Sequence, residues 1–220
     1  METRLQRVKV ISFDAEGTLA SHAFSRTIWQ EVVPRMYGEK HGLPFAQAAG
    51  QVFAQYHTIG PNRSEWYDIG YWFRRLDLGE ALPVIESHRS LIEFYPDSVP
   101  VLNALRGRFR LVVASSTPME FLKPLLRDVD QSIDRYFSST TALGRLKDEE
   151  FFRWMCAEME AEPSEVLHVG DSWNHDYVSA SAAGLVSLYL DRSGSGDDCL
   201  HSLEGLASHL GEQNSPESCL

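Results

Sequence analysis

Two carboxylates separated by a single residue, Asp14 and Glu16, are the first side chains whose spacing could support chemistry. They follow an apolar run at residues 8–13, and residues two positions apart in an extended segment point to the same side, so both can face one ligand. Gly17 comes next and allows the backbone to turn its amides towards an anion. An exposed acidic turn explains the same residues equally well.

A second polar group follows the apolar run at residues 110–114. Ser115 and Ser116 stand here, ahead of Pro118 and a helical pattern at 119–126. Hydroxyls and free amides at a helix N-terminus can bind a phosphate group. The same residue types form ordinary helix caps, which is their commoner use.

Lys147 and the pair Asp171 and Asp176 complete the candidate residues. A lone lysine ahead of a helix is usually a surface charge, but beside a phosphoryl site it can neutralise the transferring oxygens. The two aspartates flank the turn after a third apolar run, at 166–169, where they could hold a hard divalent cation or cap a helix. His175 is expected to pack beside the site or face solvent, because nothing nearby resembles a zinc cluster.

The elements that must position these groups alternate between strand and helix. Four short apolar runs, at 8–13, 110–114, 166–169 and 185–190, predict buried strands with helical patterns between them. This alternation predicts an α/β fold with a doubly wound, Rossmann-like parallel sheet. All four strands become polar at their carboxyl ends, which is the edge where open α/β sheets bind ligands.

Residues 21–92 interrupt this alternation with helical patterns joined by Gly and Pro. They predict a helical cap domain, inserted after the first strand so that it covers the carboxyl edge of the sheet. The core domain is then expected to comprise residues 1–20 and 93–210, and residues 211–220 are expected to be a disordered tail.

Aromatic side chains are concentrated in one stretch of the predicted cap, as Trp66, Tyr67, Trp72 and Phe73. Packing between helices is the ordinary role for such residues, and contact with an organic leaving group is the alternative. The arginines at 74–75 are candidates to meet an anionic substrate.

Composition excludes several classes of function. The chain has 31 Asp and Glu against 20 Lys and Arg, a formal charge of −11, so binding to nucleic acid or to an anionic membrane surface is not expected. No apolar stretch reaches the length of about 20 residues that a membrane-spanning helix needs. The three cysteines form no close pair, which predicts reduced thiols and a cytoplasmic location. Nothing in the sequence indicates an oligomeric state.

In their chain order, these motifs resemble those of the haloacid dehalogenase-like (HAD) hydrolase superfamily, in the branch with a helical cap after the first motif. The signature elements have counterparts in Asp14-Ala15-Glu16-Gly17-Thr18-Leu19, Ser115, Lys147 and the segment from Gly170-Asp171 to Asp176. The resemblance covers residues 8–191, and the last motif with its strand is the most specific part.

The resemblance implies that Asp14 is a nucleophile that takes the phosphoryl group as an aspartyl-phosphate. Glu16 would be the general acid towards the leaving group and then the general base towards water. A Mg²⁺ ion would be held by Asp14, the backbone carbonyl of Glu16, and Asp171.

The same resemblance implies that Ser115 and Lys147 bind the phosphoryl oxygens, with Ser116 beside them. Asp176 would orient Lys147 or reach the metal through water.

Two positions depart from the common pattern of the superfamily. Glu16 stands where the usual phosphatases have Asp, and Asp148 stands where a proline usually follows the lysine. Glutamate keeps the carboxyl chemistry with a longer reach, and the enolase-phosphatases share this Asp-x-Glu-Gly-Thr form. True haloacid dehalogenases tend to carry an apolar or aromatic residue at the position of Glu16 and to lack the acidic pair, so Glu16 with Asp171 and Asp176 favours phosphate chemistry.

The leading expectation is therefore an enzyme, a Mg²⁺-dependent phosphatase of a small phosphorylated metabolite that acts through Asp14. One alternative is a haloacid dehalogenase-type hydrolase, which would cleave carbon–halogen bonds with the same nucleophile and no metal. Another is a non-catalytic regulator that is phosphorylated on Asp14 or binds a phosphorylated ligand. The helical insertion disfavours a receiver-like regulator, because receiver domains are short and uncapped.

Overall fold

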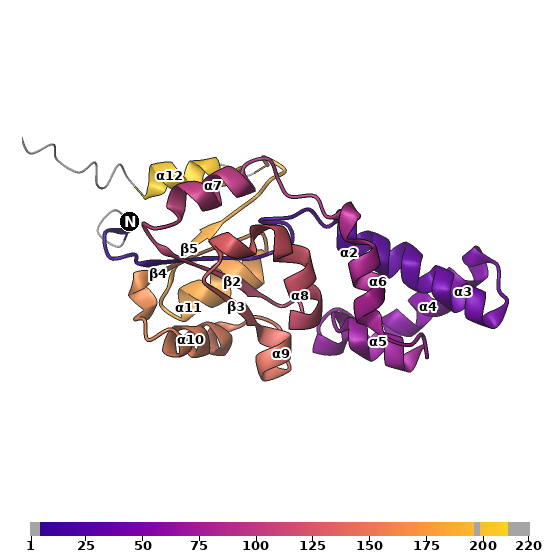
Figure 1. Ribbon diagram of the computed structural model, residues 1–220. Helices are drawn as coiled ribbons and strands as arrows, with labels where there is room; N and C mark the ends of the chain where they lie inside the picture. Colours follow the sequence, from indigo (N-terminus) through magenta and orange to yellow (C-terminus); the bar gives the residue numbers. More distant parts are fainter. Residues whose placement is uncertain (1–4, 196–198, 211–220) are drawn as a thin grey trace, which may run out of the picture.

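A five-stranded parallel sheet lies at the centre of the computed structural model, which describes residues 5–195 and 199–210 (Figure 1). The tail predicted at 211–220 lies outside the described residues. The strand order is β3-β2-β1-β4-β5, with β1 (Val10–Phe13), β2 (Arg110–Ser115), β3 (Arg135–Ser138), β4 (Val166–Gly170) and β5 (Val186–Tyr189). The predicted α/β fold with a doubly wound, Rossmann-like parallel sheet is confirmed.

Strand β3 has no counterpart among the strands expected from the sequence. It contains four residues, begins with the exposed Arg135 and the half-buried Tyr136, and pairs with β2 at the edge of the sheet. An edge strand this short lacks the continuous apolar run that marks strands buried on both faces, so its pattern does not stand out.

Residues along the central strands alternate between two hydrophobic clusters. Ile11 and Phe13 of β1 face one cluster and Val10 faces the other, and β2 and β4 repeat this alternation. The first cluster is covered by α7 (Ser98–Leu105), α8 (Met119–Leu126) and α12 (Glu204–His209), and the second by α10 (Glu149–Glu158) and α11 (Ser179–Ala182). Helices therefore cover both faces of the sheet, which is why its strands are almost wholly apolar.

Short elements complete this part of the chain. They are α9 (Ser139–Leu143), the 3₁₀ turns η4 (Arg127–Ser132) and η5 (Pro163–Glu165), and the π-helical turn η6 (Trp173–Val178). The connection between β4 and β5 is thus a π turn that continues into α11.

Residues 23–91 form helices beside the sheet (Figure 1). These are α2 (Ala23–Thr27), η1 (Ile28–Val32, a π turn), α3 (Val33–His41), α4 (Phe45–Ile59), η2 (Ser64–Trp66), α5 (Ile69–Arg75), α6 (Ala81–Ser87) and η3 (Arg89–Leu91). The chain enters and leaves this segment along two adjacent stretches, because Ala20 forms an antiparallel bridge with Phe94 and the Ser21 amide donates to the Glu93 carbonyl oxygen at 2.8 Å. None of the described helices is long and apolar enough to cross a membrane.

The strand order brings three motifs to one point of the sheet. The chain builds β2 and β3 on one side of β1 and β4 and β5 on the other, so its direction of winding reverses at β1. Phe13, the last residue of β1, lies in register with Val113 of β2 and with Val169 of β4. The residues that follow these three positions therefore meet at the carboxyl edge, where ligand sites form in open α/β sheets.

Candidate active site

Asp14 begins the loop after β1 and is almost completely buried, with 8 % of its surface exposed. Its amide donates to the Val169 carbonyl oxygen at 2.9 Å, which fixes the start of the loop against β4. Gly17 has a φ of 80°, and a Cβ built there would lie 2.0 Å from a carboxylate oxygen of Asp171. Only glycine therefore allows this loop to approach the Asp171 loop so closely.

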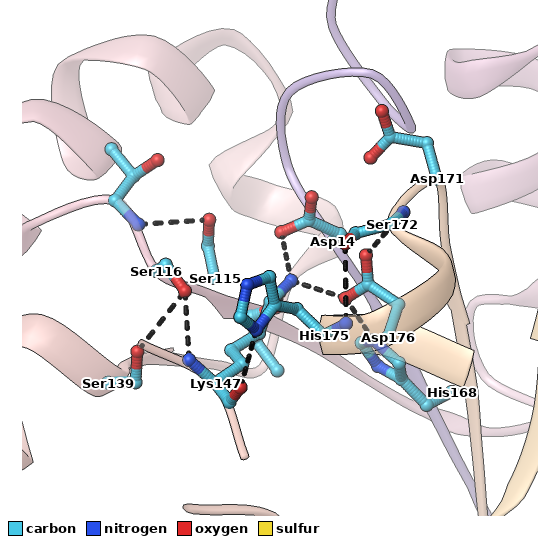
Figure 2. Close-up of polar contacts among 12 residues, drawn as sticks. Asp14, Ser115, Ser116, Ser139, Lys147, His168, Asp171, Ser172, His175 and Asp176 are labelled. Atoms are coloured by element: carbon cyan, nitrogen blue, oxygen red, sulfur yellow. Dashed lines mark hydrogen bonds and ion pairs between the residues drawn. The ribbon is translucent and has the colours of Figure 1, made fainter. Parts of the chain in front are cut away.

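Lys147 lies between two of the predicted carboxylates (Figure 2). Its Nζ donates to Asp14 Oδ1 at 2.6 Å, to Asp176 Oδ1, and to the Ala114 carbonyl oxygen at 3.2 Å. Burial alone would lower the pKa of Lys147, but the negative charges of Asp14 and Asp176 raise it above its usual value. The two carboxylates therefore favour the charged form of this ammonium group.

The backbone of Lys147 is held from two sides. Its amide donates to Ser116 Oγ at 3.0 Å, and its carbonyl oxygen accepts a hydrogen bond from His175 Nδ1 at 2.9 Å. Asp148, the residue that replaces the usual proline, accepts a hydrogen bond from the Phe151 amide at 2.9 Å and caps α10. The departure at Asp148 thus leaves a well-defined helix start directly after the lysine.

Asp176 is fully buried in the π turn η6 and has a hydrogen-bond donor on each carboxylate oxygen. Oδ1 accepts from Lys147 and from His168 Nε2 at 2.9 Å, and Oδ2 accepts from the Ser172 amide at 2.9 Å. Burial would raise the pKa of Asp176, but the charge of Lys147 and the hydrogen bonds from His168 and Lys147 bring it below its usual value. A Cβ at Gly170 would lie 2.2 Å from Asp176 Cγ, so glycine is needed there as well.

His168 is a residue of this cluster that the sequence analysis missed. It lies inside β4 with no exposed surface, and its Nδ1 is 2.9 Å from Ser12 Oγ on the paired position of β1. Because the Asp176 carboxylate can only accept, Nε2 carries the proton, and the Ser12 hydroxyl donates to Nδ1. Burial lowers the pKa of His168, which keeps the ring neutral. The available signal was a polar residue in an otherwise apolar strand.

The acidic residues form a set that fits a divalent cation. Ligand oxygens of Asp14, Asp171 and Asp176 all lie within 4.8 Å of one another. Burial is the main cause that raises the pKa of Asp14 to about 7; Lys147 opposes it, and the charges of Asp176 and Asp171 add to it. An all-oxygen donor set of this kind suits Mg²⁺ or Ca²⁺. Since Asp176 is already engaged by three donors, Asp14 and Asp171 are the carboxylates with oxygen atoms available for an ion.

Glu16 reaches the same cavity from the first loop. Its Oε1 is buried and has no hydrogen-bond partner among the described residues. Burial raises the pKa of Glu16, and the neighbouring Ser25 and His22 offset part of that rise. A buried carboxyl group with a raised pKa holds its proton more readily than a solvated one, as a general acid requires.

The two predicted serines have different surroundings. Ser115, at the end of β2, is 3 % exposed and its Oγ accepts a hydrogen bond from the Thr117 amide at 3.2 Å. Ser116 Oγ accepts from the Lys147 amide and is 3.4 Å from Ser139 Oγ. The Ser116 oxygen therefore helps to hold the lysine loop.

One cavity of about 640 Å³ contains all the predicted site residues, which are Asp14, Glu16, Ser115, Ser116, Lys147, Asp171 and Asp176. Trp66 and Tyr67 also line it, whereas Trp72 and Phe73 are buried in the hydrophobic core. Packing is thus the role of Trp72 and Phe73, whereas contact of Trp66 and Tyr67 with a leaving group stays a prediction. The arginines at 74–75 are not among the residues that line this cavity.

Comparisons with known proteins identify the family of this chain. A family model described as a hydrolase, haloacid dehalogenase-like hydrolase, matches residues 8–184. The GMP/IMP nucleotidase YrfG of Escherichia coli (strain K12) is 26 % identical over 171 residues, which are 76 % of each chain. The crystal structure of a HAD phosphatase from Thermococcus onnurineus has a TM-score of 0.81 and 21 % identity, covering 93 % of this chain and 98 % of that one.

A 2-haloacid dehalogenase from Pseudomonas syringae pv. Tomato DC3000 has the same fold, with a TM-score of 0.68, 19 % identity, and coverage of 92 % of this chain and 98 % of that one. Both solved structures are distant enough in sequence that they show the fold alone. The family match spans most of the chain, from β1 to the end of the last motif. The chain belongs to the haloacid dehalogenase-like hydrolases.

Proposed function

We propose that this protein is a Mg²⁺-dependent phosphatase of small phosphorylated metabolites that forms an aspartyl-phosphate on Asp14. The observation that carries this proposal is the buried 2.6 Å contact between Asp14 and Lys147, at a point where two further carboxylates converge. A carboxylate nucleophile beside a fixed ammonium group and ligands for a divalent ion suits phosphoryl transfer, in which catalysis is mainly positioning and charge stabilisation.

The reaction has two displacements. In the first, a carboxylate oxygen of Asp14 bonds to phosphorus while the bond to the leaving oxygen breaks, and Glu16 gives that oxygen its proton. In the second, water gives a proton to Glu16 and attacks phosphorus, which releases inorganic phosphate and restores the Asp14 carboxylate. The raised pKa of the buried Glu16 supports its part as the acid of the first step.

Lys147 and Ser115 are proposed to bind the phosphoryl oxygens. Lys147 is the ammonium group in contact with the nucleophile, and Ser115 lies at the end of the strand beside β1. Asp176 orients Lys147, and Ser116 accepts a hydrogen bond from the lysine amide and is proposed to bind phosphate beside it.

A Mg²⁺ ion is assigned to Asp14, Asp171 and the backbone carbonyl of Glu16. When bound, it supplies positive charge that offsets the phosphoryl oxygens and the clustered carboxylates. The charge balance supports this assignment, because three carboxylates, those of Asp14, Asp171 and Asp176, converge beside the single ammonium group of Lys147.

Residues 1–20 and 93–210 are proposed as the core domain and residues 21–92 as a cap that excludes bulk water from the reaction. The name of the Escherichia coli relative, a GMP/IMP nucleotidase, supports nucleoside monophosphates as the first substrates to test. A cytoplasmic location is proposed from the cysteine content.

The experiment is phosphate release from p-nitrophenyl phosphate and from GMP, with Mg²⁺ or with EDTA. Wild-type protein is expected to hydrolyse at least one ester in Mg²⁺ and neither in EDTA, and Asp14→Asn is expected to have no activity. Asp128→Asn is the control that should behave as wild type, because Asp128 is exposed and does not line the cavity. Turnover in EDTA would contradict the proposal, and a stable phosphoryl group on Asp14 without phosphate release would support a regulator instead.

A further inference from the structure

The part of the cavity formed by the helical segment is aromatic. Trp29 of η1, Phe53 of α4 and Trp66 of η2 line it, and each of these side chains is half-buried. In contrast, Trp72 of α5 has no exposed surface. Three large rings thus present part of their surface to the cavity that contains Asp14, although the core of the same segment accommodates other aromatic residues completely.

We call the side chains of Trp29, Phe53 and Trp66 the aromatic wall. One buried residue, Tyr56, contacts all three of their rings. Its ring centroid lies 5.8 Å from that of Trp29, 6.0 Å from that of Phe53 and 6.2 Å from that of Trp66. The rings of Trp29 and Trp66 meet it at 83° and 62°, which are edge-to-face arrangements. The Tyr56 hydroxyl also donates to the Trp29 carbonyl oxygen at 3.3 Å. The aromatic surface is therefore fixed before any ligand binds, which reduces the entropy lost on binding.

The charge of this wall differs from that of the whole chain. The protein carries a formal charge of −11, yet no acidic residue between 21 and 92 is among those that line the cavity. Arg26 and Gln30 line it beside Trp29, and within residues 5–195 and 199–210 no carboxylate lies within ion-pair distance of Arg26. This part of the cavity thus combines the flat apolar surfaces of the aromatic wall with the hydrogen-bond donors of Arg26 and Gln30, as expected where a polar heteroaromatic ring binds.

We propose that the aromatic wall, defined as Trp29, Phe53 and Trp66, binds a flat heteroaromatic ring on the leaving group, so that the substrates are nucleoside monophosphates. The inference rests on the proposed phosphatase function, which places the phosphate at Asp14 and Lys147. A cavity of about 640 Å³ has room for both parts of such an ester, since sites for small molecules commonly measure about 300–1,000 Å³.

The test compares two esters that share their phosphorylated sugar, inosine 5′-monophosphate and ribose 5-phosphate. Stacking on this wall should make kcat/KM about 5- to 150-fold higher for the nucleotide, which is the range that stacking of one base on an aromatic side chain provides. Equal or faster hydrolysis of ribose 5-phosphate would overturn the inference and leave the phosphatase proposal intact. If neither ester nor p-nitrophenyl phosphate is hydrolysed, the phosphatase proposal fails.

A binding measurement keeps the inference testable in that last case. Calorimetric titration of the wild type with each ester, in EDTA so that turnover is suppressed, should give the same preference for the nucleotide. Equal affinities for inosine 5′-monophosphate and ribose 5-phosphate would overturn the inference without any reference to catalysis.

Substitutions in the aromatic wall test whether its residues cause the preference for the nucleotide over ribose 5-phosphate. Trp66→Leu is expected to reduce the ratio of kcat/KM between the two esters at least fivefold, and Trp66→Phe, which keeps a ring, is expected to retain most of it. Phe45→Leu is the matched control, because Phe45 lies on α4 like Phe53 but is 46 % exposed and outside the cavity lining. If Trp66→Leu slows both esters equally while its melting temperature stays that of the wild type, the role is structural and the inference is wrong.

Discussion

Replacing the proposed nucleophile should stabilise the metal-free protein. Burial, with the charges of Asp176 and Asp171, raises the pKa of Asp14 from 3.8 to about 7. The folded protein therefore holds this proton up to about pH 7, whereas the unfolded chain releases it near the ordinary value. As the pH rises through this window, the free energy of unfolding of the wild type falls, because ionisation favours the unfolded state. Asp14→Asn has no such proton and escapes this loss.

The size of the effect follows from the two pKa values. Each pH unit between them corresponds to about 1.4 kcal/mol, so the interval from 3.8 to about 7 sets an upper limit of about 4 kcal/mol. Water that enters the open cavity lowers the cost of the charge, so we expect Asp14→Asn to gain about 2–4 kcal/mol over the wild type between pH 4 and pH 8. Bound Mg²⁺ should reverse the trend, because it stabilises the folded wild type through a carboxylate that the variant lacks.

Urea unfolding followed by circular dichroism, in EDTA and at a series of pH values, measures this difference. Asp128→Asn is the control, since Asp128 is 67 % exposed and its surface ion pair contributes little. Its stability difference from the wild type should stay constant with pH. A constant difference for Asp14→Asn as well, or an Asp14→Asn protein that is less stable than the wild type at pH 8 in EDTA, would refute the reasoning.

Three further substitutions test other parts of the site. Lys147→Met leaves the buried carboxylates of Asp14 and Asp176 without their cation and should destabilise the protein by about 3–5 kcal/mol in urea unfolding at neutral pH; a loss below about 1 kcal/mol would contradict the buried ion pairs. His168→Leu removes a donor to Asp176 and should cost about 1–3 kcal/mol in stability, with kcat reduced more than KM is changed; unchanged kcat would show that the ring does not help to position Lys147 through Asp176. Glu16→Gln should release one equivalent of p-nitrophenol per enzyme in a burst and then stall, because p-nitrophenolate leaves without needing an acid whereas no base then activates water, and steady turnover measured by stopped flow would exclude the acid–base role.

Much of the fold could be predicted because the sheet is buried on both faces. The runs at 8–13, 110–114 and 166–169 are apolar for that reason, and each ends in the polar residues that later prove to share one cavity. The edge strand β3 could not be recognised, since four residues with one open side need no such pattern.

Part of the site depends on register, which a single sequence does not reveal. Ser12 and His168 lie 156 positions apart and meet only because β1 and β4 pair in parallel with these residues opposite each other. Trp66 of η2 and Trp72 of α5 both contact the Tyr56 ring, yet Trp66 lines the cavity and Trp72 is buried, a difference that depends on the tertiary packing of the helices.

The close pairing of the two stretches that lead into and out of the helical segment has a consequence for how such a chain can diverge. The Tyr95 amide donates to the Leu19 carbonyl oxygen at 3.0 Å, one step beyond the bridge between Ala20 and Phe94. The two ends of the helical segment therefore lie side by side. In this geometry a segment can be inserted or exchanged without straining the sheet and its helices. A recombination event between these points would replace the whole aromatic wall in one step and leave Asp14, Lys147 and Asp171 in register on an unchanged sheet.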